Sequence, residues 1–378
     1  MPSRRLTNLT DIEDFARGAT FFGTGGGGSS ESGVKALKEQ LEAGREIGWI
    51  DVSDVPDDYF TASAFGMGSI APKTEETYLQ MEDFGLGKER YPRRSELLIE
   101  ALHQLERFSG KEIKVLVPGE VGGGNSCTLI AAAAESGRPA VDGDYAGRAV
   151  PSIFQTGPFI AKKPLLPLAS VNQWDNVCFI DKTCNWRMAE RIGKQLSIAG
   201  FLGCGLAGFL MPGADMKEAV FRNTMSESYE VGKLIREARD GGEDPVVAVT
   251  EMLGGWVLCR GVVSKKEWWD KEGYYWGYHT FTGTGGFLGV ELKVFFKNEN
   301  HVCWRNGEVL ATSPDMIIAV SDETCEPMTN TAVQEGMKMA VIGLKARGIS
   351  RSPRGIETLG PRNFGLKSDY VPIEEKMR

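Results

Sequence analysis

The sequence has little histidine, no excess of basic residues and no long unbroken hydrophobic run. Its net charge of -8 argues against a nucleic-acid or anionic-membrane partner, because either would favour a basic surface. The uncharged stretch 198–213 is too short for a membrane span and is interrupted by five glycines and Pro212, so we interpret it as a closely packed buried segment. The 3 histidines are widely separated, which does not match the ligand spacing of a histidine-rich zinc site.

The cysteines also lack a pattern. There are 7 of them, an odd number, at no regular spacing, and no apolar signal-peptide core follows the basic residues near the N-terminus. A reducing, cytoplasmic location is therefore expected. A chain of 378 residues with 42% hydrophobic content can bury one large core or two ordinary ones, and two domains are the better expectation.

The stretch 114–151 carries the densest functional pattern. It predicts a buried strand at Val115–Val117, a glycine-rich loop that begins with Glu120, a helix of small residues, and a second short strand that carries Asp142 and Asp144. Ligands of open α/β sheets bind beyond the carboxyl ends of the strands. We therefore expect the chemistry at this end of the sheet.

The rest of the chain predicts a two-domain protein with an α/β and a β-rich part. Helical and strand patterns alternate up to Pro151, which indicates a mostly parallel α/β sheet domain over residues 1–167. Residues 168–345 predict a second, α+β domain that begins with helices and is rich in β-strands. Residues 346–378 are expected to form a tail that returns to the N-terminal domain.

Two further segments have specific expectations. A helix is predicted near residues 184–195, with three inward-facing side chains: Trp186, Ala189 and Ile192. The aromatic-rich segment 268–278 favours sheet packing or a subunit contact over a lid on the substrate, so a homo-oligomer is a possibility.

A glycine run follows the first predicted helix. Gly23, Gly25 and Gly28 satisfy the pattern G-x-G-x-x-G, but the dinucleotide fingerprint follows a strand, so no nucleotide is expected. The backbone N–H groups of Gly25, Gly26 and Gly27 could instead bind an anion or a carbonyl oxygen of the substrate. An equally weighted alternative is a turn that only allows close packing.

Several stretches resemble one known family, the S-methyl thiohydantoin desulfurases, which are also described as hydantoinase-like. The similarity extends from end to end in the same order and is carried by five stretches: ARGATFFGTGGGG, VPGEVGGGNS, VDGDYAGRAVP, FKNENHVCWRNGEVLATSPDMI and SPRGIETLGPRNFGLKSDYVP. The resemblance implies two domains, an α/β one and a β-rich one. It also implies hydrolytic loss of the sulfur substituent from C2 of a five-membered thiohydantoin ring. Other members accompany hydantoin and oxoproline hydrolases, so the substrate class is a small cyclic amide or thiohydantoin.

Such a hydrolysis needs a base for water, an acid for the ring nitrogen or leaving thiolate, and polar donors. Glu120, Asp142 and Asp144 are the candidate acid and base, because crowded carboxylates raise the pKa of at least one of them. Asn125 and the loop N–H groups, including that of Gly123, could donate to a ring carbonyl. The three carboxylates could instead bind a divalent metal ion or merely cap loops.

Arginines could bind a carboxylate on the substrate. Arg354 and Arg362 lie in rigid proline- and glycine-containing turns of the tail, and Arg148 follows the paired aspartates. We expect one arginine, Arg354 or its rival Arg148, to face the cleft, although the tail arginines could instead hold the tail onto the first domain.

Two functions from different classes remain open at this level. The first is a hydrolase of hydantoin-type rings. The second is a non-catalytic subunit that binds small molecules or acts as a scaffold for a cyclic-amide hydrolase. Convergent carboxylates and polar loops favour the hydrolase, because a scaffold would need only apolar surface.

Overall fold

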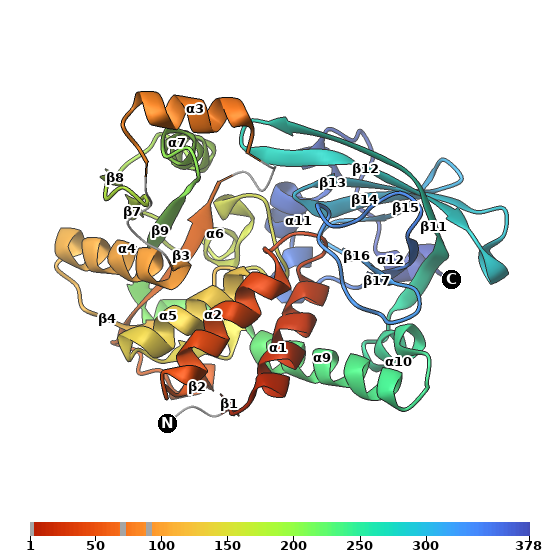
Figure 1. Ribbon diagram of the computed structural model, residues 1–378, viewed down its shortest axis with the longest axis horizontal. Helices are drawn as coiled ribbons and strands as arrows, with labels where there is room; N and C mark the ends of the chain where they lie inside the picture. The colour runs from red at the N-terminus through yellow and green to blue at the C-terminus, as the bar shows by residue number, and fades with distance from the viewer. Residues whose placement is uncertain (1–3, 69–72, 88–92) are drawn as a thin grey trace.

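The computed structural model describes residues 4–68, 73–87 and 93–378 and contains two large β-sheets beside each other (Figure 1). The first sheet has eight strands within this part of the chain, in the order β1-β2-β5-β4-β3-β9-β7-β8. Their bounds are β1 (Arg4–Leu6), β2 (Ile47–Ile50), β3 (Phe60–Met67), β4 (Ile113–Leu116), β5 (Ala140–Val141), β7 (Leu168–Val171), β8 (Val177–Ile180) and β9 (Cys204–Pro212).

The centre of this sheet is parallel. Strands β2, β5, β4 and β3 pair in parallel, whereas β9 pairs antiparallel with β3 and extends the sheet toward β7 and β8. The sheet therefore continues beyond residue 167, where the sequence had suggested the domain boundary. The physical reason is that the uncharged segment 198–213 contains β9, a largely buried strand that pairs with the free edge of β3.

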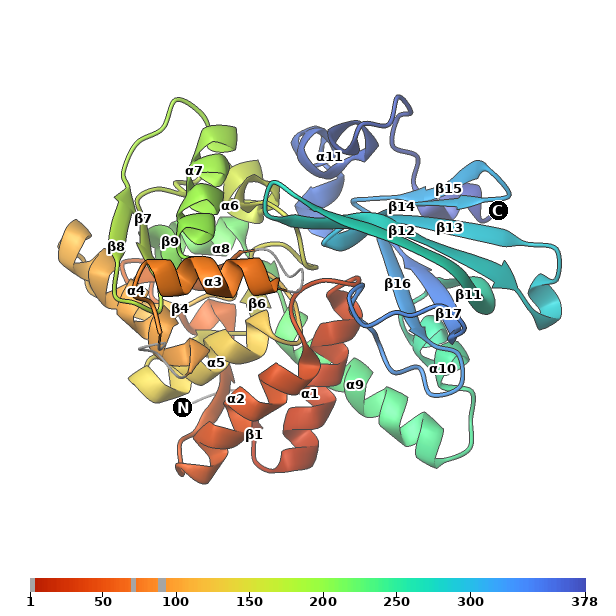
Figure 2. The ribbon, with the colours of Figure 1, turned by 45° about the horizontal axis from the view of Figure 1, so that its top comes forward.

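Helices cover both faces of the first sheet. The helices that precede the second sheet have the bounds α1 (Leu9–Phe22), α2 (Ser30–Glu42), α3 (Glu75–Asp83), α4 (Arg94–Ser109), α5 (Asn125–Ser136), α6 (Gly157–Ile160), α7 (Trp186–Ala199), α8 (Gly213–Ala219), α9 (Thr224–Asp240) and α10 (Pro245–Met252). Figure 2 shows α2 and α5 on one side of the sheet and α7 with α8 on the other. Both faces of the sheet are apolar, because successive side chains of a strand point to opposite faces. Leu116 of β4 packs in the core under α2, α4 and α5, while Val115 and Val117 pack in the core on the opposite face.

The second sheet is antiparallel throughout and has seven strands among the described residues, in the order β15-β14-β13-β12-β11-β17-β16. Their bounds are β11 (Trp256–Lys271), β12 (Tyr274–Gly283), β13 (Glu291–Lys297), β14 (Glu299–Arg305), β15 (Glu308–Thr312), β16 (Met316–Ser321) and β17 (Lys338–Leu344). Asn306 and Gly307, at φ 50° and 85°, form the turn between β14 and β15. The predicted combination of an α/β domain and a β-rich domain is confirmed.

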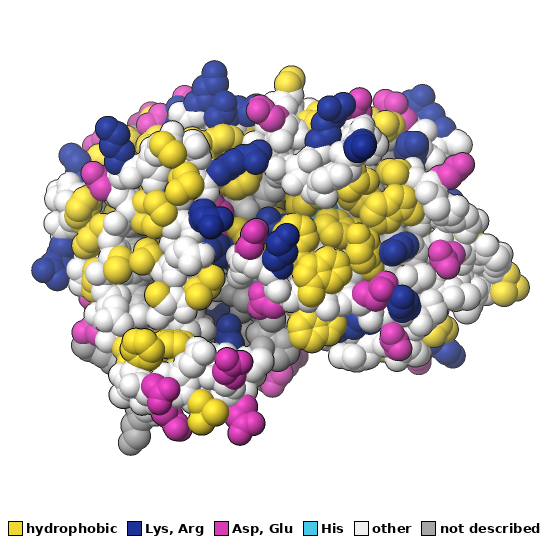
Figure 3. Space-filling model, turned by 90° about the horizontal axis from the view of Figure 1, so that it is seen from above, with side chains coloured by type: hydrophobic (Ala, Val, Ile, Leu, Met, Phe, Trp, Pro, Cys, Tyr) yellow, Lys and Arg dark blue, Asp and Glu magenta, His cyan; other side chains and the backbone are white. Residues whose placement is uncertain are grey.

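Aromatic side chains gather on this second sheet. Trp269, Trp276 and Tyr278 pack against one another or against Phe295, and hydrophobic side chains cover the same region in the space-filling view (Figure 3). Trp268 and Trp269 remain 48% and 40% exposed. These contacts are sheet packing; a contact with a second subunit remains a prediction.

The tail carries α11 (Pro353–Leu359) and α12 (Ile373–Lys376) and contacts both domains. Gln155 Nε2 donates to the carbonyl of Thr358 at 3.0 Å, and Arg351 pairs with Asp315 and Glu374. The tail thus links the segment between strands β5 and β7 of the first sheet to the second domain. Across the described ranges, the helices are all too short or too polar to span a bilayer.

Candidate active site

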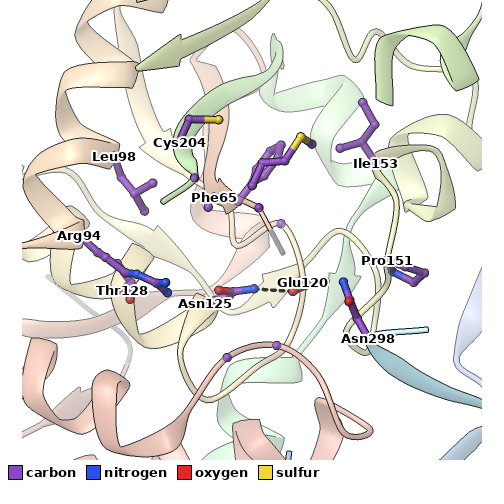
Figure 4. Close-up of a pocket in the computed structure, with 18 of the residues that line it drawn as sticks. Phe65, Arg94, Leu98, Glu120, Asn125, Thr128, Pro151, Ile153, Cys204 and Asn298 are labelled. Carbon is purple, nitrogen blue, oxygen red and sulfur yellow. Dashed lines mark hydrogen bonds between the residues drawn. The ribbon is translucent and has the colours of Figure 1, made fainter. Parts of the chain in front are cut away.

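A cavity of about 380 Å³ opens beyond the carboxyl ends of β3 and β4, where ligands of α/β sheets bind. Residues from both domains line it (Figure 4). The first domain provides the loop after β4, the N-terminal turns of α4 and α5, the start of β9 and one face of α7. The second domain provides the junction of β13 and β14, at Asn298 and Glu299. The site is therefore complete only when the two domains are packed together.

Glu120 lies in the loop between β4 and α5 and is held by two donors. Its Oε1 accepts a hydrogen bond from Asn125 Nδ2 at 2.6 Å, and its Oε2 accepts one from the backbone N–H of Val150 at 2.8 Å. Burial raises the pKa of Glu120 to about 7, although both hydrogen bonds oppose this shift. Near neutrality the side chain can therefore serve as a base.

Glu299 is the second carboxyl group of the cavity, and the sequence did not single it out. It is only 3% exposed, and its Oε2 has no hydrogen-bond partner among the described residues. Burial, together with the negative charge of Glu120, raises the pKa of Glu299 well above its usual value. A carboxyl group of this kind stays protonated when Glu120 ionises, so the pair can provide a base and an acid at once.

Helix α7 brings two charged side chains to the same cavity. Lys194 is 6% exposed, and its ammonium lies over the ring of Tyr274, 4.2 Å from the centroid. Burial lowers the pKa of Lys194, against the attraction of nearby carboxylates that include Glu299 and Glu120. Glu190, one turn earlier, accepts hydrogen bonds from the Tyr274 hydroxyl at 2.6 Å and from the Ile153 N–H at 2.8 Å.

The predicted orientation of α7 is wrong at one position. Ile192 was expected to face inward, but it is 36% exposed, while Ala189, Glu190 and Lys194 are buried. The helix directs a partly charged face toward the cavity because Tyr274 of the second domain and the Ile153 backbone provide hydrogen-bond partners there.

The structure does not bring Asp142 and Asp144 into the cavity lining. Asp142 Oδ1 accepts hydrogen bonds from the backbone N–H groups of Met225 and Ser226, so this carboxylate caps helix α9. Asp144 is fully buried, and its Oδ1 accepts hydrogen bonds from the N–H groups of Ala146 and Gly147 at 2.6 Å each. Both contacts match the loop-capping alternative.

The three carboxylates of Glu120, Asp142 and Asp144 therefore do not form a shared cation site. Within the described ranges, no group of three histidine, cysteine, aspartate or glutamate side chains is placed to hold a metal ion. Asp144 still acts on the cavity electrostatically, because its charge helps to raise the pKa of Glu120.

The glycine loops mainly pack against each other and against side chains. The carbonyl of Gly27 accepts hydrogen bonds from the N–H groups of Gly124 and Asn125, and Gly27 itself lines the cavity. Gly25, Gly26 and Gly123 do not line it. Gly25 accepts a hydrogen bond from the Asn330 N–H, Gly26 packs on the Glu299 carboxylate, and Gly123 packs on the Thr20 side chain. These three glycines therefore allow neighbouring groups to pack closely, and they do not line the cavity.

The predicted arginine clamp is also placed elsewhere. Arg148 is 2% exposed and donates to Thr24 Oγ1 and to the carbonyls of Asn300 and Asp315, which joins the two domains. Arg354 Nε donates to the Phe159 carbonyl at 3.0 Å. Neither arginine lines the cavity, because backbone carbonyls occupy their donors; Arg362 pairs with Asp369 and is 71% exposed.

The protein thus combines an α/β domain and a β-rich domain with an interdomain cavity that contains two carboxyl groups of raised pKa. Such a pair is suited to acid–base chemistry on a small molecule. The chain belongs to the S-Me-THD-like family: residues 10–182 match its N-terminal domain and residues 184–373 its C-terminal domain. This result confirms the family resemblance of the sequence.

One solved structure adds support for the fold. The chain is similar to a crystallised protein from Chromobacterium violaceum, with a TM-score of 0.76 and 22% identity over 98% of this chain and 100% of that one. No curated protein matches the chain.

Proposed function

We propose that this protein hydrolyses S-methyl thiohydantoin-type rings and releases the sulfur substituent of C2 as a thiol. The observation that carries the proposal is the pair Glu120 and Glu299, two carboxyl groups of raised pKa that face one cavity from different domains. The family name is consistent with this substrate class.

The cavity suits a small ring. Its volume of about 380 Å³ lies in the usual range of small-molecule sites. Phe65, Leu98 and Phe209 provide apolar wall, while Glu120, Asn125 and Glu299 provide polar groups. A planar five-membered ring can pack on the apolar wall with its C2 and nitrogen atoms toward the carboxyl groups.

The two glutamates have distinct roles in this proposal. Glu120 removes one proton from water as the water oxygen bonds to C2, and Glu299 donates its proton to the adjacent ring nitrogen. When the C2–S bond breaks, the hydroxyl proton leaves the new C2 oxygen, and a proton from the carboxyl pair reaches the departing thiolate. Water thus supplies the carbonyl oxygen of the hydantoin and the two protons found on the ring nitrogen and the thiol.

Asn125 and Lys194 support these steps. Asn125 orients Glu120 through their hydrogen bond of 2.6 Å. The ammonium of Lys194 favours the ionised form of both Glu120 and Glu299 and can offset charge that develops on the ring.

The test uses the purified chain alone with an S-methyl thiohydantoin, and headspace analysis of methanethiol avoids interference from the exposed thiol of Cys184. We expect thiol release by the wild type and a loss in kcat of about 100-fold or more in Glu120→Gln and in Glu299→Gln. The exposed Glu112, which pairs with Lys114, provides the control variant Glu112→Gln.

Two results would contradict the proposal. Near-normal kcat in both cavity variants would show that the carboxyl pair is not catalytic. Absence of thiol release by the wild type, with release only after a cyclic-amide hydrolase is added, would favour the non-catalytic subunit.

A further inference from the structure

Arg94 is a cation at the cavity that has no partner among the described residues. It is the first residue of α4, lines the cavity and is exposed. Figure 4 shows its guanidinium extended toward Asn125 and Thr128. Arg94 makes no hydrogen bond or ion pair with any residue that the structure describes. Its neighbour Arg93 differs, because it pairs with Glu96 and with Glu135 at 2.7 Å.

The other charges of the cavity have partners. Glu190 is hydrogen-bonded to the Tyr274 hydroxyl and the Ile153 N–H. Glu120 and Glu299 both have a raised pKa and influence each other, and Lys194 lies close enough to interact with both. Arg94 is therefore the positive charge that is available to bind an anionic group of a ligand. The N-terminus of the sixteen-residue helix α4, where Arg94 lies, also favours a negative charge.

We infer that Arg94 determines substrate specificity by binding a carboxylate on the C5 side chain of the ring. This inference rests on the proposed function, which places C2 beside Glu120 and Glu299. With C2 there, a C5 substituent can extend toward α4. The substrates are then thiohydantoins of acidic amino acids, and a guanidinium suits their carboxylate because it can donate two parallel hydrogen bonds.

The test compares two pairs of S-methyl thiohydantoins that differ only in side-chain charge. The acidic rings derive from aspartate and glutamate, and the neutral rings derive from asparagine and glutamine. In Arg94→Gln we expect KM for the acidic rings to rise about 10- to 100-fold, as expected for loss of a charge-assisted hydrogen bond. We expect kcat, and KM for the neutral rings, to stay within about twofold, because Arg94 has no part in the proposed proton transfers at C2.

Two further variants sharpen the result. Arg94→Lys keeps the charge without the planar donor pair, so we expect an intermediate rise in KM for the acidic rings. Arg354→Gln replaces an arginine outside the cavity lining, and we expect no change in the preference for acidic rings. No change in KM of Arg94→Gln, or an equal rise for acidic and neutral rings, would overturn the assignment.

A binding experiment separates this inference from the proposed reaction. If the wild type released no thiol from any ring, the proposed reaction would fail, and calorimetric titration with the four corresponding hydantoins would still test Arg94. Tighter binding of the acidic hydantoins that is lost in Arg94→Gln supports the carboxylate site. Equal binding of acidic and neutral hydantoins by the wild type, or no binding of either, overturns it.

Discussion

At the scale of single residues, a glycine determines where the Glu299 carboxylate can lie. A Cβ atom added at Gly26 would lie 2.0 Å from Glu299 Oε1, closer than any real contact. The φ angle of Gly26 is outside the left-handed region, so alanine is compatible with its backbone. The absence of a side chain at Gly26 therefore serves the placement of Glu299 rather than direct substrate binding.

We predict that Gly26→Ala lowers kcat/KM by about 10- to 100-fold, because displacing a reacting group by about 1 Å has an effect of this size. The free energy of unfolding should change little, since the far end of a flexible side chain can move aside. Steady-state kinetics and urea unfolding measure the two effects.

Gly286 provides the matched control for Gly26, because its added Cβ would meet nothing within 4 Å. Gly286→Ala should leave kcat/KM unchanged. Unchanged kinetics in Gly26→Ala as well would show that the reaction does not depend on the position of Glu299.

At the scale of elements, helices α1 and α9 approach each other through two glycines. A Cβ atom at Gly18 would lie 1.7 Å from the Ser228 carbonyl oxygen, and one at Gly232 would lie 1.8 Å from the Asp14 carbonyl oxygen. Helix α1 leads into the glycine loop that holds Gly26 against Glu299, and Asp142 caps α9. The close contact of the helices therefore positions one wall of the cavity.

We predict that Gly18→Ala lowers the free energy of unfolding by about 1–3 kcal/mol, because the backbones must separate. In a helix without this contact, the same change would stabilise the protein by up to about 1 kcal/mol, so the sign is informative. Urea unfolding, with Gly286→Ala for comparison, measures the effect. A stabilised Gly18→Ala variant would be incompatible with the close approach of α1 and α9.

At the scale of the whole molecule, buried carboxyl groups link stability to pH. Burial raises the pKa of Glu120 to about 7 and of Asp144 to about 6, and it also raises the pKa of Glu299 well above its usual value. Between pH 5 and 8 the unfolded chain has lost protons that the folded protein still binds at these groups. At these carboxyl groups unfolding releases protons, so their contribution to stability falls as the pH rises through this window. The buried His279 and His301 act in the opposite direction below about pH 6.5, because burial lowers their pKa and the unfolded chain binds protons there that the folded protein does not.

We predict that the stability of Glu120→Gln relative to the wild type increases by roughly 1–3 kcal/mol from pH 5 to pH 8, because this difference isolates the Glu120 carboxyl group from the opposing histidines. Urea unfolding of both proteins at constant ionic strength measures the difference. The lowered pKa of Glu374, at about 2, affects stability only in more acidic solution. A stability difference between the two proteins that stays constant from pH 5 to pH 8 would contradict the raised pKa of Glu120.

The sequence alone determined the two-domain fold class, the family and the position of Glu120, one of the two carboxyl groups of the cavity. A short apolar run at Val115–Val117, followed by a glycine loop and a helix, was sufficient to place Glu120 and Asn125 beyond a strand end. These features follow from local periodicity and from the general position of ligands in α/β sheets. The stretch FKNENHVCWRNGEV contains Glu299 and was the available signal for the second carboxyl group.

Only the tertiary structure decided which polar residues meet. Glu299 reaches Glu120 because the junction of β13 and β14 packs on the glycine loop after α1, a contact between distant segments that no local pattern encodes. Asp142 lies equally close to a strand end, but the N–H groups of α9 occupy its carboxylate. Local sequence predicts on which strand end or loop a residue lies. The role of its side chain depends on the partners that long-range packing brings within hydrogen-bond distance.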